Sequence, residues 1–174
     1  TIWPRKGAPA GTALREANWK IEEIENEIRA QIELAKRRVP RVSHLSFHMG
    51  CSDWDPKVKE VCARLAKEYN LYIPPSAGTL RGTGGFGDAK TAAERTEKFI
   101  GMLEGLKPGT YLFVEHPGLD TPEMRAIGHT GYEDVAEDRQ AVTQVFTSDL
   151  VKKTVKKLGI ELISYADLKN AGKQ

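Results

Sequence analysis

Apolar residues between positions 19 and 38 recur every three or four residues, a spacing that predicts an amphipathic helix. The apolar positions are Ile21, Ile24, Ile28, Ile32 and Ala35. The same period predicts further helices over residues 56–70, 90–106, 132–146 and 149–158. Asp55 before Pro56 is a typical helix start, and Gly159 is a typical helix end.

Short β-type runs lie between these helices, and two of them end in a histidine. The runs cover residues 42–48, 71–73, 110–116 and 160–163. Because helices and strands alternate along the chain, we expect an α/β fold with a parallel sheet. With 174 residues, the chain is expected to form one α/β domain over residues 1–174.

The first of the two histidine runs would place two imidazoles on one face of a strand. Side chains alternate along an extended chain, so His44, Ser46 and His48 share a face. Two interpretations stay open: a hydrogen-bonded pair of core histidines, or a metal site, because neutral imidazole is a common metal ligand. His116 ends the second run. In parallel α/β folds the carboxyl ends of the strands carry the chemistry, so two histidines at such ends favour an active site.

Composition narrows the classes of partner. The chain has 26 basic and 24 acidic side chains and a formal net charge of +2, which argues against a dedicated nucleic-acid partner. No stretch approaches the ~18 apolar residues of a membrane span, and no signal-peptide pattern opens the chain. Because the chain begins with Thr1 rather than Met, we expect a processed or fragmentary product, and the compartment stays open. Cys51 and Cys62 are too few for a disulfide scaffold.

A glycine-rich segment over residues 78–87 matches the dinucleotide-binding pattern Gly-x-Gly-x-x-Gly in its letters, from Gly82 to Gly87. That pattern needs a strand directly before it and a helix directly after it. The nearest preceding β-type run ends at Ile73, so a loop beside an active-site mouth is the favoured interpretation.

Five short segments share their residues with one family of enzymes. They are Glu27–Glu33, Ser43–Gly50 (Ser-His-Leu-Ser-Phe-His-Met-Gly), Glu115–Gly118 (Glu-His-Pro-Gly), Phe146–Ser148 and Leu158–Leu168. On these segments the chain resembles the YdjC-like family, the ChbG/HpnK-type carbohydrate deacetylases. The resemblance covers nearly the whole chain, and the two histidine segments at this separation are its most specific part.

The chain departs from the family pattern in two places. The family usually has His-Leu-Asp-Ser-His where this chain has Ser46 and Phe47 in the middle, which removes a carboxylate that could serve the metal or the substrate. Family members also begin with a strand that ends in an Asp-Asp pair, followed by a Gly-Leu-His-Leu segment. These supply a catalytic or metal-binding Asp and another metal-binding His. Neither motif occurs here, so the chain resembles the later two-thirds of such an enzyme.

The resemblance implies a parallel (β/α) barrel-like fold, incomplete at its N-terminus, and a hydrolase that removes acetyl groups from N-acetylated amino sugars or oligosaccharides. It makes His48 the ligand of a divalent metal ion, zinc or magnesium, and His116 the general acid or a donor to the oxyanion. The residues that would orient the ligand or contact the sugar are His44, Ser46, Glu115 and Arg139. For Arg139, a surface charge on its helix is an equal alternative.

The alternative function is a non-catalytic sugar- or metal-binding fragment, or a degenerate family member, that has lost the Asp and one His. His48, even with help from His44, offers too few ligands for a tight divalent site, because catalytic zinc sites normally use three protein ligands. We therefore expect residues 1–174 alone to bind metal weakly and to lack deacetylase activity. The open sheet edge predicts association with a second copy, or with an N-terminal segment that completes the barrel.

Overall fold

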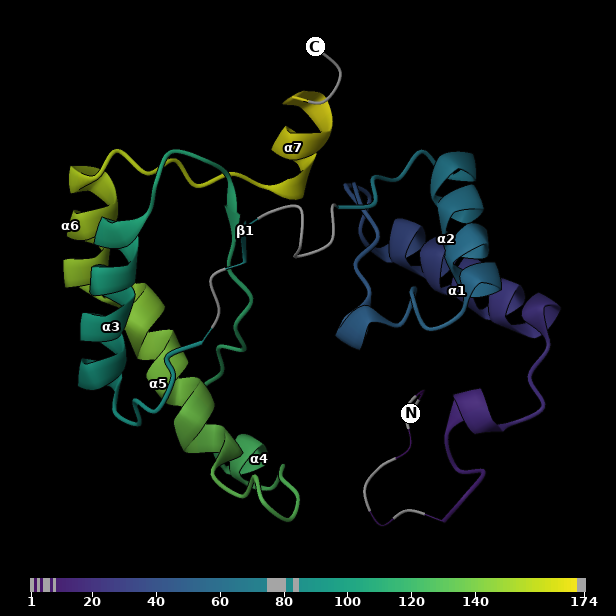
Figure 1. Ribbon diagram of the computed structural model, residues 1–174, viewed down its shortest axis with the longest axis horizontal. Helices are drawn as coiled ribbons and strands as arrows, with labels where there is room; N and C mark the ends of the chain where they lie inside the picture. Colours follow the sequence, from purple (N-terminus) through teal and green to yellow (C-terminus); the bar gives the residue numbers. More distant parts are fainter. Residues whose placement is uncertain are drawn as a thin grey trace. The chain divides into compact units, whose positions relative to one another are not determined.

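The chain folds into two compact units (Figure 1). Each unit has its own hydrophobic core. The parts of the chain that the computed structural model describes are residues 2, 4, 7, 9–74, 81–82 and 85–171. The first unit joins Thr1–Pro74 to Ile163–Gln174, and the second spans Pro75–Leu162. Each unit is therefore described by itself.

The first unit is built on two helices that follow the hydrophobic periods of the sequence. Its elements are the 3-10 turns η1 (Leu14–Glu16) and η2 (His48–Gly50) and the helices α1 (Ile21–Arg38), α2 (Pro56–Glu68) and α7 (Tyr165–Ala171). Asp55 caps α2, because its carboxylate accepts a hydrogen bond from Lys57 N at 2.8 Å. The helices predicted to begin near residues 19 and 56 are confirmed, and the first of them begins at Ile21.

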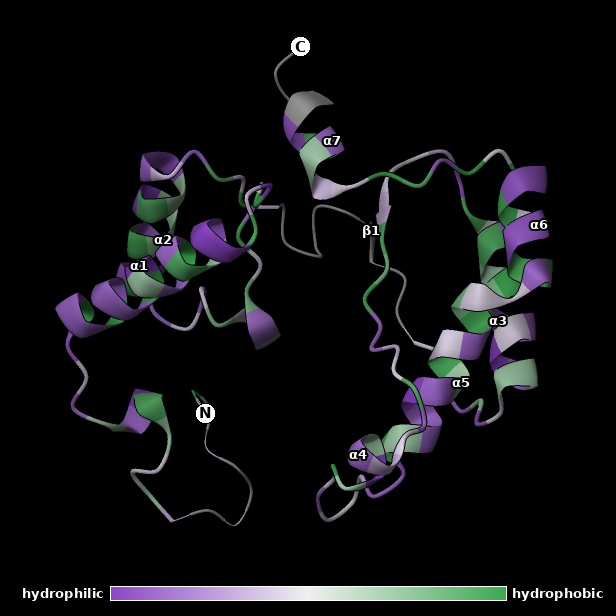
Figure 2. Cartoon of the chain, turned by 180° about the vertical axis from the view of Figure 1, so that it is seen from behind, coloured by the Kyte–Doolittle hydropathy of each residue, from purple (hydrophilic) through white to green (hydrophobic). Residues whose placement is uncertain are grey.

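Leu65 lies at the centre of the first unit's core and is fully buried. It packs with Ile32, Val61 and Leu71, so the cluster joins α1, α2 and the segment that follows α2. Figure 2 shows green hydrophobic and purple hydrophilic stretches in alternation along α1 and α2, as expected for helices with one buried face. Packing of these faces, more than helix propensity, keeps the two helices together.

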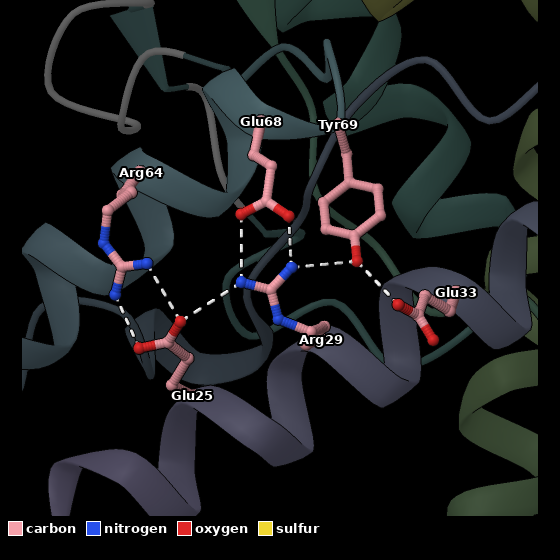
Figure 3. A network of polar contacts seen from close by, with 6 residues as sticks. All are labelled: Glu25, Arg29, Glu33, Arg64, Glu68 and Tyr69. Atoms are coloured by element: carbon pink, nitrogen blue, oxygen red, sulfur yellow. Dashed lines mark hydrogen bonds and ion pairs between the residues drawn. The ribbon is translucent and has the colours of Figure 1, made fainter.

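A network of charged side chains also ties α1 to α2 (Figure 3). Arg29 on α1 donates two hydrogen bonds to Glu68 on α2. In return, Arg64 on α2 donates to both carboxylate oxygens of Glu25 on α1, at 2.9 and 2.5 Å. The hydrogen bond from Arg64 lowers the pKa of Glu25 to about 2, so this carboxylate stays charged at neutral pH.

The second unit is formed mainly by α3, α5 and α6, which pack against one another (Figure 1). Its elements are β1 (Arg81–Gly82), α3 (Ala92–Gly105), β2 (Tyr111–Leu112), α4 (Pro122–Arg125), α5 (Val135–Thr147) and α6 (Asp149–Lys157). Val145 is fully buried, and the rings of Phe99 and Phe146 meet edge to face with centroids 5.2 Å apart. The helices predicted over residues 90–106, 132–146 and 149–158 are confirmed.

A buried ion pair joins α3 to α5. The Arg95 side chain is 8% exposed, and its Nη2 lies 2.5 Å from Oδ1 of Asp138. The Tyr132 hydroxyl donates to the other carboxylate oxygen at 2.7 Å. Burial raises the pKa of Asp138, but hydrogen bonds from Tyr132 and Arg95 outweigh it and hold the pKa below its usual value. The carboxylate therefore stays charged beside the guanidinium.

The prediction of a parallel (β/α) barrel-like sheet is wrong for the described residues. Helices dominate, and the described strands are two residues long: β1 pairs with β2 in parallel, in the register Arg81 with Tyr111 and Gly82 with Leu112. One further parallel bridge joins His44 to Tyr72. The predicted parallel direction is kept in both pairings, but no ladder long enough for a barrel wall forms in this part of the chain.

In the described part of the chain, the predicted strands do not form a barrel-like sheet because β-type residues favour an extended backbone but do not by themselves supply a neighbouring strand to pair with. A strand forms its ladder only when a neighbour lies in register beside it. Val114 is 60% exposed and Leu162 is 84% exposed. Apolar side chains of two predicted strands thus face solvent rather than the interior of a barrel.

Half of the glycine-rich segment predicted as a loop, residues 78–80 and 83–84, lies outside the described residues, and Arg81–Gly82 within it forms β1. Phe86, at the end of that segment, is buried in the second unit's core. None of the helices in the described ranges is long and apolar enough to cross a membrane.

Candidate functional site

The run that carries His44 and His48 is held in place by one tyrosine. Tyr72 N donates to Ser43 O at 2.9 Å, and Leu45 N donates to Tyr72 O at 2.8 Å. This is the hydrogen-bond pattern of a parallel bridge around His44. His48 then begins the 3-10 turn η2. The two histidines therefore come from one short segment of the first unit.

The side chains of His44, Ser46 and His48 line one cavity of about 630 Å³ in the first unit. Most of the remaining lining is apolar, while Glu27 and Gln31 add polar groups from α1. Gln31 Nε2 donates to Glu27 Oε1 at 2.7 Å. An apolar cavity with a few convergent polar groups is the usual form of a small-molecule site.

His44 is oriented by two neighbours. Its Nδ1 lies 3.1 Å from the Ser43 hydroxyl, and its ring centroid lies 4.6 Å from that of Tyr165 on α7. The side chains of Ser46 and His48 are exposed and form no hydrogen bond with other described residues. His44 is thus fixed by the fold, whereas His48 is accessible to a ligand.

Sequence reasoning missed the aromatic wall of this cavity. Trp19 and Trp54 line it and contact each other edge to face, with ring centroids 4.9 Å apart. Trp54 lies in the loop before α2, where no period marks it as a packing residue. Cys51 also lines the cavity, and burial raises its pKa, as it raises the pKa of Cys62 to about 11. Both thiols are therefore protonated at neutral pH, which makes them weak nucleophiles.

The described residues do not complete a metal site. No group of three or more His, Cys, Asp or Glu side chains among them is placed to hold a metal ion. A catalytic zinc site normally takes three protein ligands. His48 therefore remains a predicted ligand that lacks, in this part of the chain, the partners such a site needs.

The second histidine run ends in solvent. Phe113 follows β2 and packs edge to face on Phe99 with centroids 4.9 Å apart, which attaches the run to the core. Glu115 is half-buried and His116 is exposed, and neither side chain has a hydrogen-bond partner among the described residues. The imidazole of His116 is therefore accessible from solvent.

Arg139 lies on α5 beside the loop that follows His116. Its backbone oxygen accepts a hydrogen bond from Gly118 N at 3.2 Å. Its Nε is buried and has no hydrogen-bond partner within the described part of the chain. The structure thus places Arg139 next to the Glu115–Gly118 segment, with one buried donor that these residues do not satisfy.

The structure groups the predicted site residues by unit. The first unit holds His44, Ser46 and His48, and the second holds Glu115, His116 and Arg139. No described sheet joins the two histidine runs, because His44 pairs with Tyr72 whereas β2 pairs with β1. A single site that uses both His48 and His116 stays a prediction.

Comparisons with known proteins address the family directly. The family described as YdjC-like protein matches residues 4–157. Among solved structures, a protein from Enterococcus faecalis V583, described as a candidate cellobiose-phosphate cleavage protein, aligns with a TM-score of 0.64 at 22% identity. The alignment covers 96% of this chain and 72% of that chain, and it shows likeness of fold alone. No curated protein matches. Because the family match spans most of this chain, the chain belongs to the YdjC-like family, which includes carbohydrate deacetylases.

Proposed function

We propose that the protein hydrolyses the acetamido group of N-acetylated amino sugars, with His116 as the proton donor to the leaving amine. Family membership supports a hydrolase that acts on carbohydrates. The observation that carries the proposal is the exposed imidazole of His116 at the end of a run attached to the core. Amide hydrolysis needs an acid that can reach the amine nitrogen, and this imidazole is accessible to one.

The reaction makes two demands on the protein. Water adds to the carbonyl carbon and gives a tetrahedral intermediate that carries a negative oxygen. The C–N bond then breaks as the nitrogen receives a proton, and acetate and the free amino sugar leave. His116 would supply that proton. The carboxylate that takes a proton from the water is expected from the family's Asp-Asp motif, which does not occur in residues 1–174.

The first unit holds a cavity that could take a small molecule. Its volume, about 630 Å³, lies within the range of small-molecule sites. We also propose His48 as one ligand of a divalent metal ion, zinc or magnesium. The described residues do not supply the further ligands that a tight metal site needs, so we propose metal binding as the only role of His48.

A non-catalytic sugar-binding protein is the second candidate, and Ser46 favours it. The family pattern has a carboxylate where Ser46 stands, and its loss weakens a catalytic or metal-binding site more than a sugar-binding one. A hydrolase and a sugar-binding protein would both bind an N-acetylated sugar, but only the hydrolase would release acetate.

The experiment measures acetate release from N-acetylated amino sugars by the complete natural protein. His116→Ala should lower kcat by about 10²–10⁴-fold, the usual contribution of a general acid. The matched control is His129→Ala, an exposed histidine of the same unit whose Nδ1 contacts Thr130 O at 3.0 Å, and it should leave kcat unchanged. Near-normal kcat in His116→Ala would assign the proton to another group. Sugar binding without acetate release would establish the second candidate.

A further inference from the structure

The loop that follows His116 is attached to α5 through Gly118. Gly118 N donates to Arg139 O at 3.2 Å, and Thr143 Oγ1 donates to Gly118 O at 2.7 Å. Both backbone polar groups of one residue therefore bond to one helix, at positions one turn apart. This fixed point lies two residues after His116.

Gly118 packs closely against side chains of α5 and α4. A Cβ atom there would lie 3.1 Å from Arg139 Cβ and 3.2 Å from Met124 Cε. Such contacts are closer than ordinary van der Waals packing, so a side chain at this position would make its neighbours move by a few tenths of an ångström. The loop is thus seated directly on the helix.

The hydroxyl of Thr143 donates to the loop, whereas that of Thr147, one turn later on α5, donates to the helix. Thr residues inside helices usually donate to the carbonyl four residues earlier, as Thr147 does to Thr143 O at 2.8 Å. Thr143 lies 3.1 Å from its own such carbonyl, Arg139 O, but only 2.7 Å from Gly118 O. With a single proton, the hydroxyl donates best to the nearer acceptor, which belongs to the loop.

A second hydrogen bond reinforces the attachment. Asp120 N donates to Oε1 of Gln140, which is also on α5, at 2.9 Å. The loop thus touches α5 at residues 118 and 120, while the other side of His116 is attached to the core through Phe113. The imidazole stands on a short segment that is fixed at both ends.

We propose that Thr143 is a positioning residue for His116: its hydroxyl, through Gly118, sets where the imidazole stands. This inference rests on the proposed function, because it needs His116 to act on a substrate. Proton transfer depends steeply on geometry, and a displacement of about 1 Å can cost on the order of 10²-fold in rate. A group that acts only in the transition state changes kcat and leaves KM unchanged.

Thr143→Val tests this role, because valine keeps the branched shape and removes the donor. In the complete protein, kcat for acetate release should fall by about 10–100-fold with KM unchanged. Thr143→Ser keeps the hydroxyl and should restore kcat. Thr147→Val, on the same helix with a hydroxyl that serves only the helix, should match the wild type. Circular dichroism at the assay temperature that is unchanged in Thr143→Val shows that its lower kcat does not come from unfolded protein.

A second measurement needs no activity. The ring ¹H–¹³C resonances of His116, assigned by comparison with His116→Ala, should move in Thr143→Val and stay in place in Thr147→Val. If the wild type releases no acetate, the proposed function fails, while these resonances still decide the role of Thr143. Unchanged resonances, or a Thr143→Val enzyme with wild-type kcat, would overturn the inference.

Discussion

Replacing Asp138 by Asn should destabilise the second unit, because it removes the charge that faces Arg95 in the contact between α3 and α5. The Arg95 side chain is 8% exposed, so its charge would lose its partner in a largely buried place. Breaking a buried ion pair by removing one partner costs about 3–5 kcal/mol when the remaining charge is uncompensated.

Two features of the structure reduce that magnitude. The Asp138 side chain is 30% exposed, so water screens part of the interaction. Arg95 also keeps two backbone acceptors, Ala89 O at 3.1 Å and Asp138 O at 2.9 Å. We therefore expect Asp138→Asn to lower the free energy of unfolding by about 2 kcal/mol, the magnitude of a hydrogen bond to a charged group.

The assay is urea unfolding followed by far-UV circular dichroism, with hydrogen exchange to locate the effect. Two compact units need not unfold as one, so a single transition is not assumed. Exchange should rise in peptides from α3 and α5. Tyr132→Phe, which removes one hydrogen bond to the same carboxylate, should have roughly half the effect.

The matched control is Asp88→Asn, which breaks the ion pair of a 95% exposed carboxylate with Lys98 in the same unit. Exposed pairs contribute little, so its unfolding curve should follow the wild type. Equal unfolding curves for Asp138→Asn and Asp88→Asn, or a loss of protection in the first unit instead, would show that the Arg95–Asp138 pair does not stabilise the second unit.

Two further predictions concern the first unit. Acid should weaken the contact between α1 and α2 as pH falls from about 4.5 to about 2, because hydrogen bonding to Arg64 gives folded Glu25 a pKa of about 2 while its ordinary value is 4.5. The lowered pKa means that the unfolded chain binds protons more tightly, so this stability is present above pH 4.5 and lost on acidification. Glu25→Gln should reduce the acid effect, monitored by tryptophan fluorescence, and should leave the part due to Glu68, whose pKa Arg29 also lowers. In calorimetric titration of the complete protein, His48→Ala should abolish zinc uptake with the fold retained, whereas His44→Ala should weaken it by about 10–100-fold; unchanged stoichiometry in folded His48→Ala would remove it from the ligand set.

The helices could be predicted from the sequence because their signals are local. The stripe from Ile21 to Ala35, and the pair of Asp55 as cap with Pro56 as first residue, lie within one or a few turns. The structure keeps both helices with boundaries shifted by a few residues, as expected when only the terminal turns are ambiguous.

The sheet could not be predicted in the same way, because pairing joins residues that are far apart. The run around His44 finds its partner at Tyr72, and Tyr111 finds its partner at Arg81. Nothing within either run specifies that partner or the length of the ladder. Local β-propensity therefore predicted a barrel-like sheet, whereas the described pairings extend over one or two residues.

The candidate site shows the same division between local and distant information. Alternation along one run groups His44, Ser46 and His48, but Leu45 and Phe47 line the same cavity, and His48 begins the 3-10 turn η2. The bond from Thr143 to Gly118 spans 25 residues, and its only local sign is a glycine directly after His-Pro. Such contacts become visible only when the helix and the loop are seen together.

The proposed hydrolysis can be followed directly by NMR of an N-acetylated amino sugar, labelled with ¹³C in its acetyl carbonyl, in the presence of the complete natural protein. Hydrolysis predicts that the amide signal is replaced by that of free acetate, and that His116→Ala slows this change by about 10²–10⁴-fold while His129→Ala does not. An amide signal that persists in the presence of the wild-type protein, or an equal rate in His116→Ala, would contradict it.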